Sequence, residues 1–221
     1  MEPTTALWSF ALVVGLLTLT PGLDTALILR TAALRGRAEA WGVVGGIQLG
    51  TLTWGTLSSL GVSALLTASH TAYDALRLVG AAYLLWMGGR MLLGSLRRGG
   101  DTVPAEATAP EEAAREARGD VPGGALPGLR RGLLTNLLNP KMGVFYVAML
   151  PQFIPAGAPH LAMGVLLTCV HVLEGLLWSS LLVGFAGVLR GWLRRPAARR
   201  VMDRVTGVVV LGFGLKLVLG D

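Results

Sequence analysis

The chain has 221 residues, of which 52% are hydrophobic and 14% are charged, and its formal net charge is +6. A water-soluble domain of this size and composition would expose a very large apolar surface, so we expect a lipid bilayer around it. The positive charge does not indicate nucleic-acid binding, because the arginines lie in short blocks beside apolar runs, as membrane flanks do. Anionic lipid headgroups are the partner that this charge predicts.

Six apolar runs of about 20 residues, without a polar face, predict an all-α integral membrane protein with six transmembrane helices. In chain order, we expect the spans at residues 6–29, 41–66, 75–93, 133–154, 161–189 and 205–219. The third and sixth are short for a hydrocarbon core of about 30 Å. Their flanking cations Arg77, Arg90 and Lys216 are therefore expected to extend toward the headgroups.

The arginines predict the orientation of these spans. They gather in the first, third and fifth connections, whereas the second and fourth connections contain neither Lys nor Arg. Loops rich in Lys and Arg tend to stay in the cytoplasm. We therefore expect both termini outside, in a multi-pass protein of the cytoplasmic (inner) membrane of a bacterium.

The third connection, residues 97–131, mixes Glu, Ala, Pro, Gly and Arg without apolar periodicity, which predicts a flexible cytoplasmic linker. It divides the chain into residues 1–96 and 132–221, each with three spans. Because three is odd, the two halves must have opposite orientations in the membrane. Each half also opens with a span that contains a proline. The sequence thus predicts two inverted three-helix repeats that give alternating access to a central site.

The two prolines, Pro21 and Pro140, each remove one backbone donor, so the carbonyls of Leu17 and Asn136 should lose their helical partners. Such breaks persist in hydrocarbon where neighbouring helices, water or a ligand satisfy the freed group. Both prolines lie eight or nine residues from the nearest cytoplasmic arginine, hence roughly 13 Å deep at 1.5 Å per residue. A simple kink for helix packing is the alternative interpretation.

Two charged residues lie beside these breaks. Asp24 follows Pro21 by three positions and Lys141 follows Pro140 directly. Charges at this depth are costly and usually face a polar cavity or one another. We therefore expect Asp24 and Lys141 to approach each other between the halves, where Asp24 binds either the substrate or a proton. A structural ion pair is the alternative.

The fifth span contains a further acid, Glu174, with His171 three residues before it and Trp178 four residues after it. Residues at these spacings share a helical face, so a proton relay through Asp24, His171 and Glu174 is one hypothesis. A hydrogen-bonded contact between helices is the other.

The second span has glycines at every fourth position, Gly42, Gly46 and Gly50, which form a stripe where another backbone can approach closely. We interpret this stripe as a packing surface. Gln48 projects elsewhere on the same helix and is a candidate for lining the cavity.

Three stretches, LTPGLDTALILRTAALRGR, LVGAAYLLWMGGRML and GLLTNLLNPKMGVFYVAMLPQF, resemble the LysE/RhtB family of bacterial amino-acid exporters in order and spacing. The resemblance implies a six-span inner-membrane exporter of neutral or basic amino acids and related metabolites, driven by the proton gradient and without a cofactor. Leu23 departs from the family, which often has a second proline there. The resemblance gives functional weight to Pro21, Gly22, Asp24, Asn136, Asn139, Pro140, Lys141 and Gln152.

Two other functions compete with amino-acid export. A divalent-metal exporter would need several oxygen ligands, and the deep carboxylates are Asp24 and Glu174. A membrane-embedded enzyme would need a cysteine pair or a nucleophile beside a base, yet Cys169 is the single cysteine and His171 has no nearby serine on its own helical face. We therefore expect neither a metal site nor catalysis. The sequence leaves open the substrate and whether the protein forms a homo-oligomer.

The orientation can be tested with single cysteines and a membrane-impermeant thiol reagent in intact cells. Positions expected in the cytoplasm, near Arg35, Arg115 or Arg195, should resist labelling, and positions near Ser69 or Ala156 should react. The native Cys169 is first changed to Ala. Labelling near Arg195 but not near Ala156 would overturn the predicted orientation.

Overall fold

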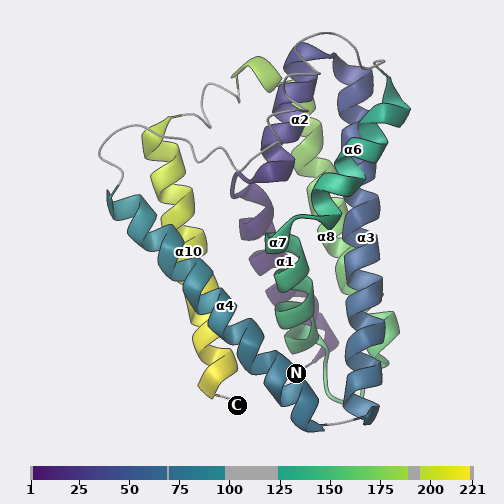
Figure 1. Ribbon diagram of the computed structural model, residues 1–221, viewed down its shortest axis with the longest axis vertical. Coiled ribbons are helices and arrows are strands. Elements are labelled where there is room, and N and C mark those ends of the chain that lie inside the picture. The colour runs from purple at the N-terminus through teal and green to yellow at the C-terminus, as the bar shows by residue number, and fades with distance from the viewer. Residues whose placement is uncertain (1, 69, 98–123, 189–194, 220–221) are drawn as a thin grey trace.

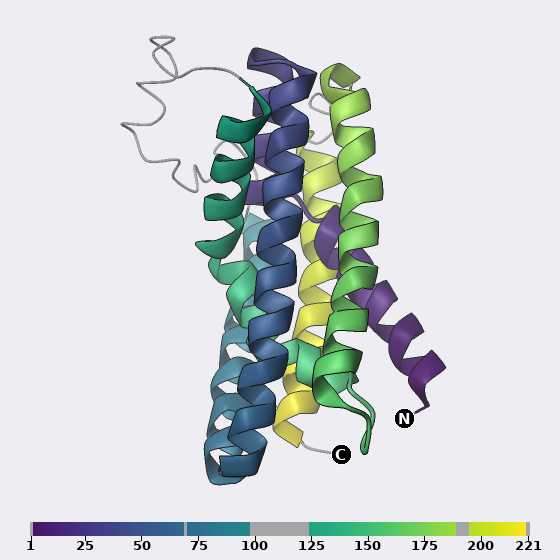
Figure 2. The same ribbon diagram turned by 90° about the vertical axis from the view of Figure 1, so that its right-hand side faces the viewer.

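The computed structural model describes residues 2–68, 70–97, 124–188 and 195–219. Within these residues every regular element is a helix, and the long helices lie side by side along the longest axis of the molecule (Figures 1 and 2).

The first expected span is two helices, α1 (Pro3–Leu19) and α2 (Leu23–Leu34), which meet at an angle of 52°. The break predicted at Pro21 is thus confirmed. Thr20 ends α1, because its backbone N–H and its hydroxyl both donate to the Leu16 carbonyl, at 3.1 and 2.8 Å. At the other end of α2, Gly36 has a φ of 92°, which favours glycine, and the chain turns directly into α3.

Two long helices complete the first half. α3 (Arg37–Ala68) contains the second expected span and α4 (His70–Arg97) contains the third.

The second half begins earlier than predicted. Residues 125–131 were expected in the flexible linker, but they form the first half of α6 (Ala125–Leu137). The helix is stable there because Gly128 and Gly132 lie directly against the backbone of α3, and because Arg131 pairs with Glu39. The rest of the expected linker, residues 98–123, lies outside the described residues.

The fourth expected span is also broken, as Pro140 predicts. After α6 come a short helix, α7 (Pro140–Val144), a π-helical turn (Phe145–Met149) and a 3₁₀ turn (Leu150–Phe153). α8 (His160–Gly184) covers most of the fifth span, and α10 (Pro196–Leu219) contains the sixth.

Among the described helices, α8 alone is long and apolar enough by itself to cross a membrane, and α1 with α2 reaches that standard as a bent pair. Large apolar side chains point outward from several helices: Trp8 is 78% exposed, Leu177 62% and Leu57 59%. Apolar surface of this kind suits contact with lipid. The arrangement of six spans as two inverted repeats stays a prediction.

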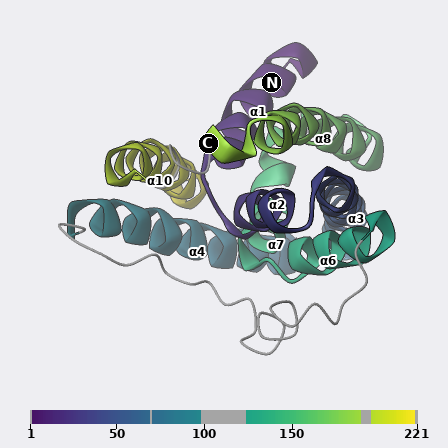
Figure 3. The same ribbon diagram turned by 90° about the horizontal axis from the view of Figure 1, so that it is seen from above.

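Helices of the two halves interleave. α3 packs most extensively on α6, and α4 packs on α10, as Figures 1 and 3 show. Each of these pairs joins one helix from the first half to one from the second. Any movement that opens a path between the halves must therefore act on contacts shared between them.

The glycine stripe of α3 forms the closest of these contacts, which agrees with its interpretation as a packing surface. A Cβ atom on Gly46 would overlap the Leu129 carbonyl, and one on Gly132 would overlap the Val43 carbonyl. The helices approach this closely because neither has a side chain in the seam.

This seam predicts opposite effects for two neighbouring substitutions. Gly46→Ala should lower the free energy of unfolding by about 1–3 kcal/mol, because the added methyl group forces α6 away from α3. Gly45→Ala is the matched control, since a Cβ atom there meets nothing within 4 Å. It should be neutral or slightly stabilising, as alanine is the better helix former. Thermal unfolding of the detergent-purified variants measures both, and equal midpoints would contradict the close contact.

Candidate functional site

The break at Pro21 leaves the Leu17 carbonyl without a helical partner, as the sequence predicts. Lys141 from the second half supplies the missing hydrogen bond: its Nζ donates to Leu17 O at 3.1 Å. A cation that deep in the protein is thereby held by a backbone group that itself needs a donor.

The carbonyl freed at Pro140 is also satisfied by a side chain from the other half of the chain, but here the first half supplies the donor. The freed Asn136 carbonyl accepts from Trp54 Nε1 at 3.3 Å and from the backbone N–H of Asn139 at 3.1 Å. Trp54 lies on α3, in the first half of the chain.

A third proline, Pro151, leaves a carbonyl of the π-helical turn without its helical donor. The sequence did not predict this break. In a π-helix each carbonyl pairs with the N–H five residues later, as Leu150 N does with Phe145 O. The next carbonyl, that of Tyr146, would need the N–H that Pro151 lacks. Ser58 on α3 donates to it instead, at 2.6 Å.

Asn139 starts α7 and fixes the course of the chain at the second break. Its Oδ1 accepts from the backbone N–H of Lys141 at 3.1 Å, which is the N-cap contact. This cap sets the direction in which the Lys141 side chain leaves the helix.

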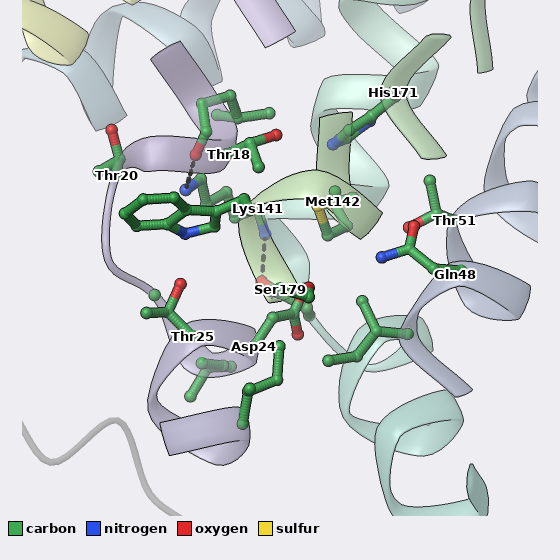
Figure 4. A pocket seen from close by; sticks show the side chains of 18 of the residues that line it. Thr18, Thr20, Asp24, Thr25, Gln48, Thr51, Lys141, Met142, His171 and Ser179 are labelled. Carbon is green, nitrogen blue, oxygen red and sulfur yellow. Dashed lines mark hydrogen bonds between the residues drawn. The ribbon is translucent and has the colours of Figure 1, made fainter. Parts of the chain in front are cut away.

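The two breaks open into one small cavity, with about 70 Å³ of water-accessible space. Figure 4 shows Asp24, Gln48, Lys141 and His171 converging on it from four helices. The cavity lies between two apolar clusters, since Leu17 and Met142 belong to one and Ile28, Ile47 and Leu182 to the other.

Asp24 lies in the first turn of α2, and its carboxylate is only half satisfied. Oδ2 accepts from the side-chain amide of Asn136 at 3.1 Å. Asn136 is fully buried and also donates to Thr51 Oγ1 at 3.4 Å. Oδ1 of Asp24 is buried and has no hydrogen-bond partner within the described residues. One oxygen of a side chain that lines the cavity is thus left without a hydrogen bond.

Lys141 brings the opposite charge to the same cavity, so the structure places both charged residues singled out in the sequence at one site. Asp24 accepts from Asn136 and Lys141 donates to the Leu17 carbonyl, while the Lys141 charge and the Asn139 side chain also lie close enough to act on the Asp24 carboxyl group. Gly22 lies next to the ammonium: a Cβ atom on it would be 3.8 Å from Lys141 Nζ. The N-terminus of α2 begins at this glycine and also lines the cavity.

Of the other residues predicted for the site, Gln48 lines the cavity and rests on α8, where a Cβ atom on Gly175 would lie 2.9 Å from its Nε2. Gln152 does not line it, because it lies in the 3₁₀ turn beyond the π-helix. Pro21 and Pro140 shape the backbone on either side without forming its wall.

His171 and Glu174 are not brought together as the relay hypothesis expects. His171 stacks on Tyr146, and its Nδ1 shares a 2.8 Å hydrogen bond with the Tyr146 hydroxyl while the outer edge of the ring points into the cavity (Figure 4). Glu174 faces α1 at Gly15 and is absent from the cavity wall. Their offset of three positions puts the two side chains about 60° apart around the helix, so they meet different neighbours.

Several polar residues of the wall were not predicted, namely Thr18, Thr20, Thr25, Thr51, Trp178 and Ser179. Hydroxyl groups and indoles are common in membrane helices, so their presence in the sequence carries little information. Only their positions could have identified them. Thr18, Thr20 and Thr25 lie within about two turns of Pro21. The other three line the cavity from α3 and α8.

Glu39 was also missed. It is 1% exposed and accepts from Arg131 Nη1 at 2.8 Å, with Arg35 Nη1 at 3.6 Å. This ion pair fastens α3 to α6 at the end of the molecule where the arginines predict the cytoplasm.

Comparison with known proteins identifies the family. The model of the LysE type translocators matches residues 15–221. The chain belongs to the LysE type translocator family. The resemblance inferred from the two proline motifs is thereby confirmed.

Relatives of this translocator match it along nearly their whole length. An uncharacterized membrane protein of Pseudomonas aeruginosa is 34% identical, over 96% of this chain and 94% of its own. A leucine efflux protein of Klebsiella pneumoniae is 29% identical, over 90% and 88%, and a threonine efflux protein of Escherichia coli K12 is 27% identical, over 91% of each chain. No solved structure matches the translocator.

The N-cap at the second break of this translocator can be tested with two substitutions of Asn139. Asn139→Ala removes the acceptor of the Lys141 amide and should cost about 0.5–2 kcal/mol of stability. Asn139→Ser also shortens the side chain but keeps an oxygen at the cap, so its unfolding midpoint should stay close to that of the wild type. If both variants unfold at the same temperature, the cap does not fix this break.

Proposed function

We propose that this translocator exports neutral amino acids with aliphatic side chains across the cytoplasmic membrane of a bacterium, by alternating access to the cavity between the Pro21 and Pro140 breaks. The observation that carries the proposal is the unpaired Oδ1 of Asp24, a buried carboxyl oxygen of a residue that lines the cavity together with Lys141.

A free amino acid crosses the membrane as a zwitterion, so its site must satisfy a cation and an anion at once. The Asp24 carboxylate is a strong acceptor for the substrate ammonium. The substrate carboxylate is attracted by the charge of Lys141 and by the N-terminus of α2, whose first amides have no helical partners. The two breaks together thus offer a partner for each end of a zwitterion.

The rest of the wall is suited to the side chain. Leu17, Ile28, Ile47, Met142 and Leu182 contribute apolar surface to the cavity. Burying an aliphatic side chain there is favourable by about 0.8 kcal/mol per CH₂ group. Leucine and its homologues match this wall.

The relatives support the same function. Those with assigned activities are named for efflux of leucine and of threonine, both neutral amino acids. Others are named membrane proteins. These names favour an amino-acid exporter over the metal exporter and the membrane enzyme that the sequence left open.

Export against a concentration gradient needs an energy source, and we propose proton antiport with both termini outside. The depth inferred for the two prolines, roughly 13 Å from the arginines, puts the site near the membrane midplane. A midplane site between inverted repeats can open to either side as contacts between the halves change.

The substitution Asp24→Asn tests the proposal directly. It keeps the size of the side chain and removes the charge, so the protein should insert normally while leucine export falls by about 10- to 100-fold, as loss of a charged hydrogen bond predicts. Internal leucine is measured in cells that express wild type or variant, with protein levels matched by immunoblot.

The exposed substitution Glu2→Gln is the control and should export like the wild type. Full export by Asp24→Asn at wild-type protein levels would overturn the role of Asp24. Unchanged leucine and threonine pools in cells that express the wild type would overturn the proposed function itself.

A further inference from the structure

Glu174 is a half-buried acid that the proposed export cycle does not use. It is the fifteenth of the 25 residues of α8, hence close to the middle of the described helix that is by itself apolar enough to span a membrane. Its Oε2 is buried and has no hydrogen-bond partner among the described residues. Since Glu174 does not line the substrate cavity, a second polar position exists outside it.

The carboxylate lies in the seam between α8 and α1. Gly15 makes room for it there: a Cβ atom on this glycine would be 3.3 Å from Glu174 Oε2. No side chain on α1 can form an ion pair with Glu174, because Pro3–Leu19 contains no titratable side chain.

Four charged or titratable groups of α8 and its neighbours have other partners. On α8 itself, His171 is turned to Tyr146 and the cavity. Lys141 of α7 is bound to the Leu17 carbonyl, and Asp24 of α2 accepts from Asn136. On α3, Arg37 donates to the Gly184 carbonyl at 3.4 Å, ten residues or roughly 15 Å along α8 from Glu174.

Two more unpaired polar atoms connect this seam with the cavity. Trp178 Nε1, one turn after Glu174 on α8, and Thr18 Oγ1, one turn after Gly15 on α1, are both buried without a hydrogen-bond partner among the described residues. Both residues line the cavity. Polar atoms therefore continue from Glu174 to the substrate site along the two faces of one seam.

An unpaired carboxylate inside hydrocarbon is costly and marks a functional site by default. Two kinds of occupant satisfy it, a proton or a donor such as water, and the proton needs no further space in the seam.

We propose that Glu174 is the position where the coupling proton binds, separate from the cavity where Asp24 holds the amino acid. This inference rests on the proposed proton antiport. In each cycle the Glu174 carboxylate takes one proton from the outer aqueous phase and becomes a neutral carboxylic acid. When the transporter next opens to the cytoplasm, Glu174 releases that proton there, which regenerates the carboxylate as the next amino acid binds.

The test uses the purified full chain in liposomes with radiolabelled leucine as the probe. One assay measures leucine accumulation driven by an imposed pH gradient, with the acidic side inside, so that proton exit drives leucine entry. The other measures exchange of labelled for unlabelled leucine at equal pH on both sides. Only the first assay requires a proton to be carried.

Glu174→Gln should lose the accumulation caused by the pH gradient and keep exchange within about twofold of the wild type. Asp24→Asn should lose both. Glu174→Asp keeps a carboxylate and should restore part of the gradient-driven accumulation. Glu2→Gln, the same chemical change at an exposed position, should match the wild type in both assays.

Gradient-driven accumulation by Glu174→Gln at the wild-type level would overturn the inference while leaving proton antiport standing. Loss of exchange together with accumulation would also overturn it, because Glu174 would then belong to the substrate site. A wild-type protein that exchanges leucine but ignores the pH gradient would remove proton antiport, and the inference with it. A wild type without exchange would remove leucine transport.

A measurement on the wild type covers the case in which the variants do not fold. Dicyclohexylcarbodiimide modifies protonated carboxyl groups in apolar surroundings, and mass spectrometry locates the adduct. We expect modification of Glu174 that declines as the pH rises and is not prevented by leucine. Absence of the adduct at every pH, or full protection by leucine, would contradict a separate proton site.

Discussion

The structure depends on one constraint, that a backbone carbonyl deprived of its partner inside a membrane must find another donor. Three prolines create three such carbonyls, and each is satisfied by a side chain from the opposite half of the chain. Lys141 donates to Leu17, Trp54 to Asn136 and Ser58 to Tyr146. The two halves are thus held together by the repair of their own helix breaks.

The same repairs build the site. Holding Lys141 against the end of α1 brings a positive charge beside the N-terminus of α2, and the turn after α6 directs Asn136 toward Asp24. One carboxylate oxygen then remains for a ligand. Around this polar centre, α3 and α6 pack backbone against backbone at Gly46 and Gly132. Separating α3 from α6 would break this contact, so the two helix breaks cannot be relieved in that way.

Much of this could be predicted from the sequence, because a proline inside an apolar run leaves the carbonyl four residues earlier without its helical donor. The two breaks, the freed Leu17 carbonyl and the packing role of the glycines follow from backbone chemistry alone. The donors to the freed carbonyls could not be predicted, because the role of Trp54 and Ser58 depends on which helix packs against α3. The first half of α6 was taken for linker because its Pro, Gly and Arg residues match the composition of the linker, whereas its packing on the backbone of α3 is visible only in the structure. Helical spacing put Glu174 and His171 on one face of the fifth span. It could not show that α1 packs against Glu174 at Gly15, away from the wall of the cavity.

We propose that the cavity recognises both the ammonium and the carboxylate of a zwitterion. Inhibition of leucine exchange by analogues that lack one of these groups measures this recognition most directly. Isocaproate has the side chain and carboxylate without the ammonium, and isoamylamine has the ammonium without the carboxylate. Each loses at least one charged hydrogen bond, so each should compete about 10- to 100-fold more weakly than unlabelled leucine. Inhibition by either analogue as strong as that by leucine would show that the corresponding charge is not recognised and would contradict the account.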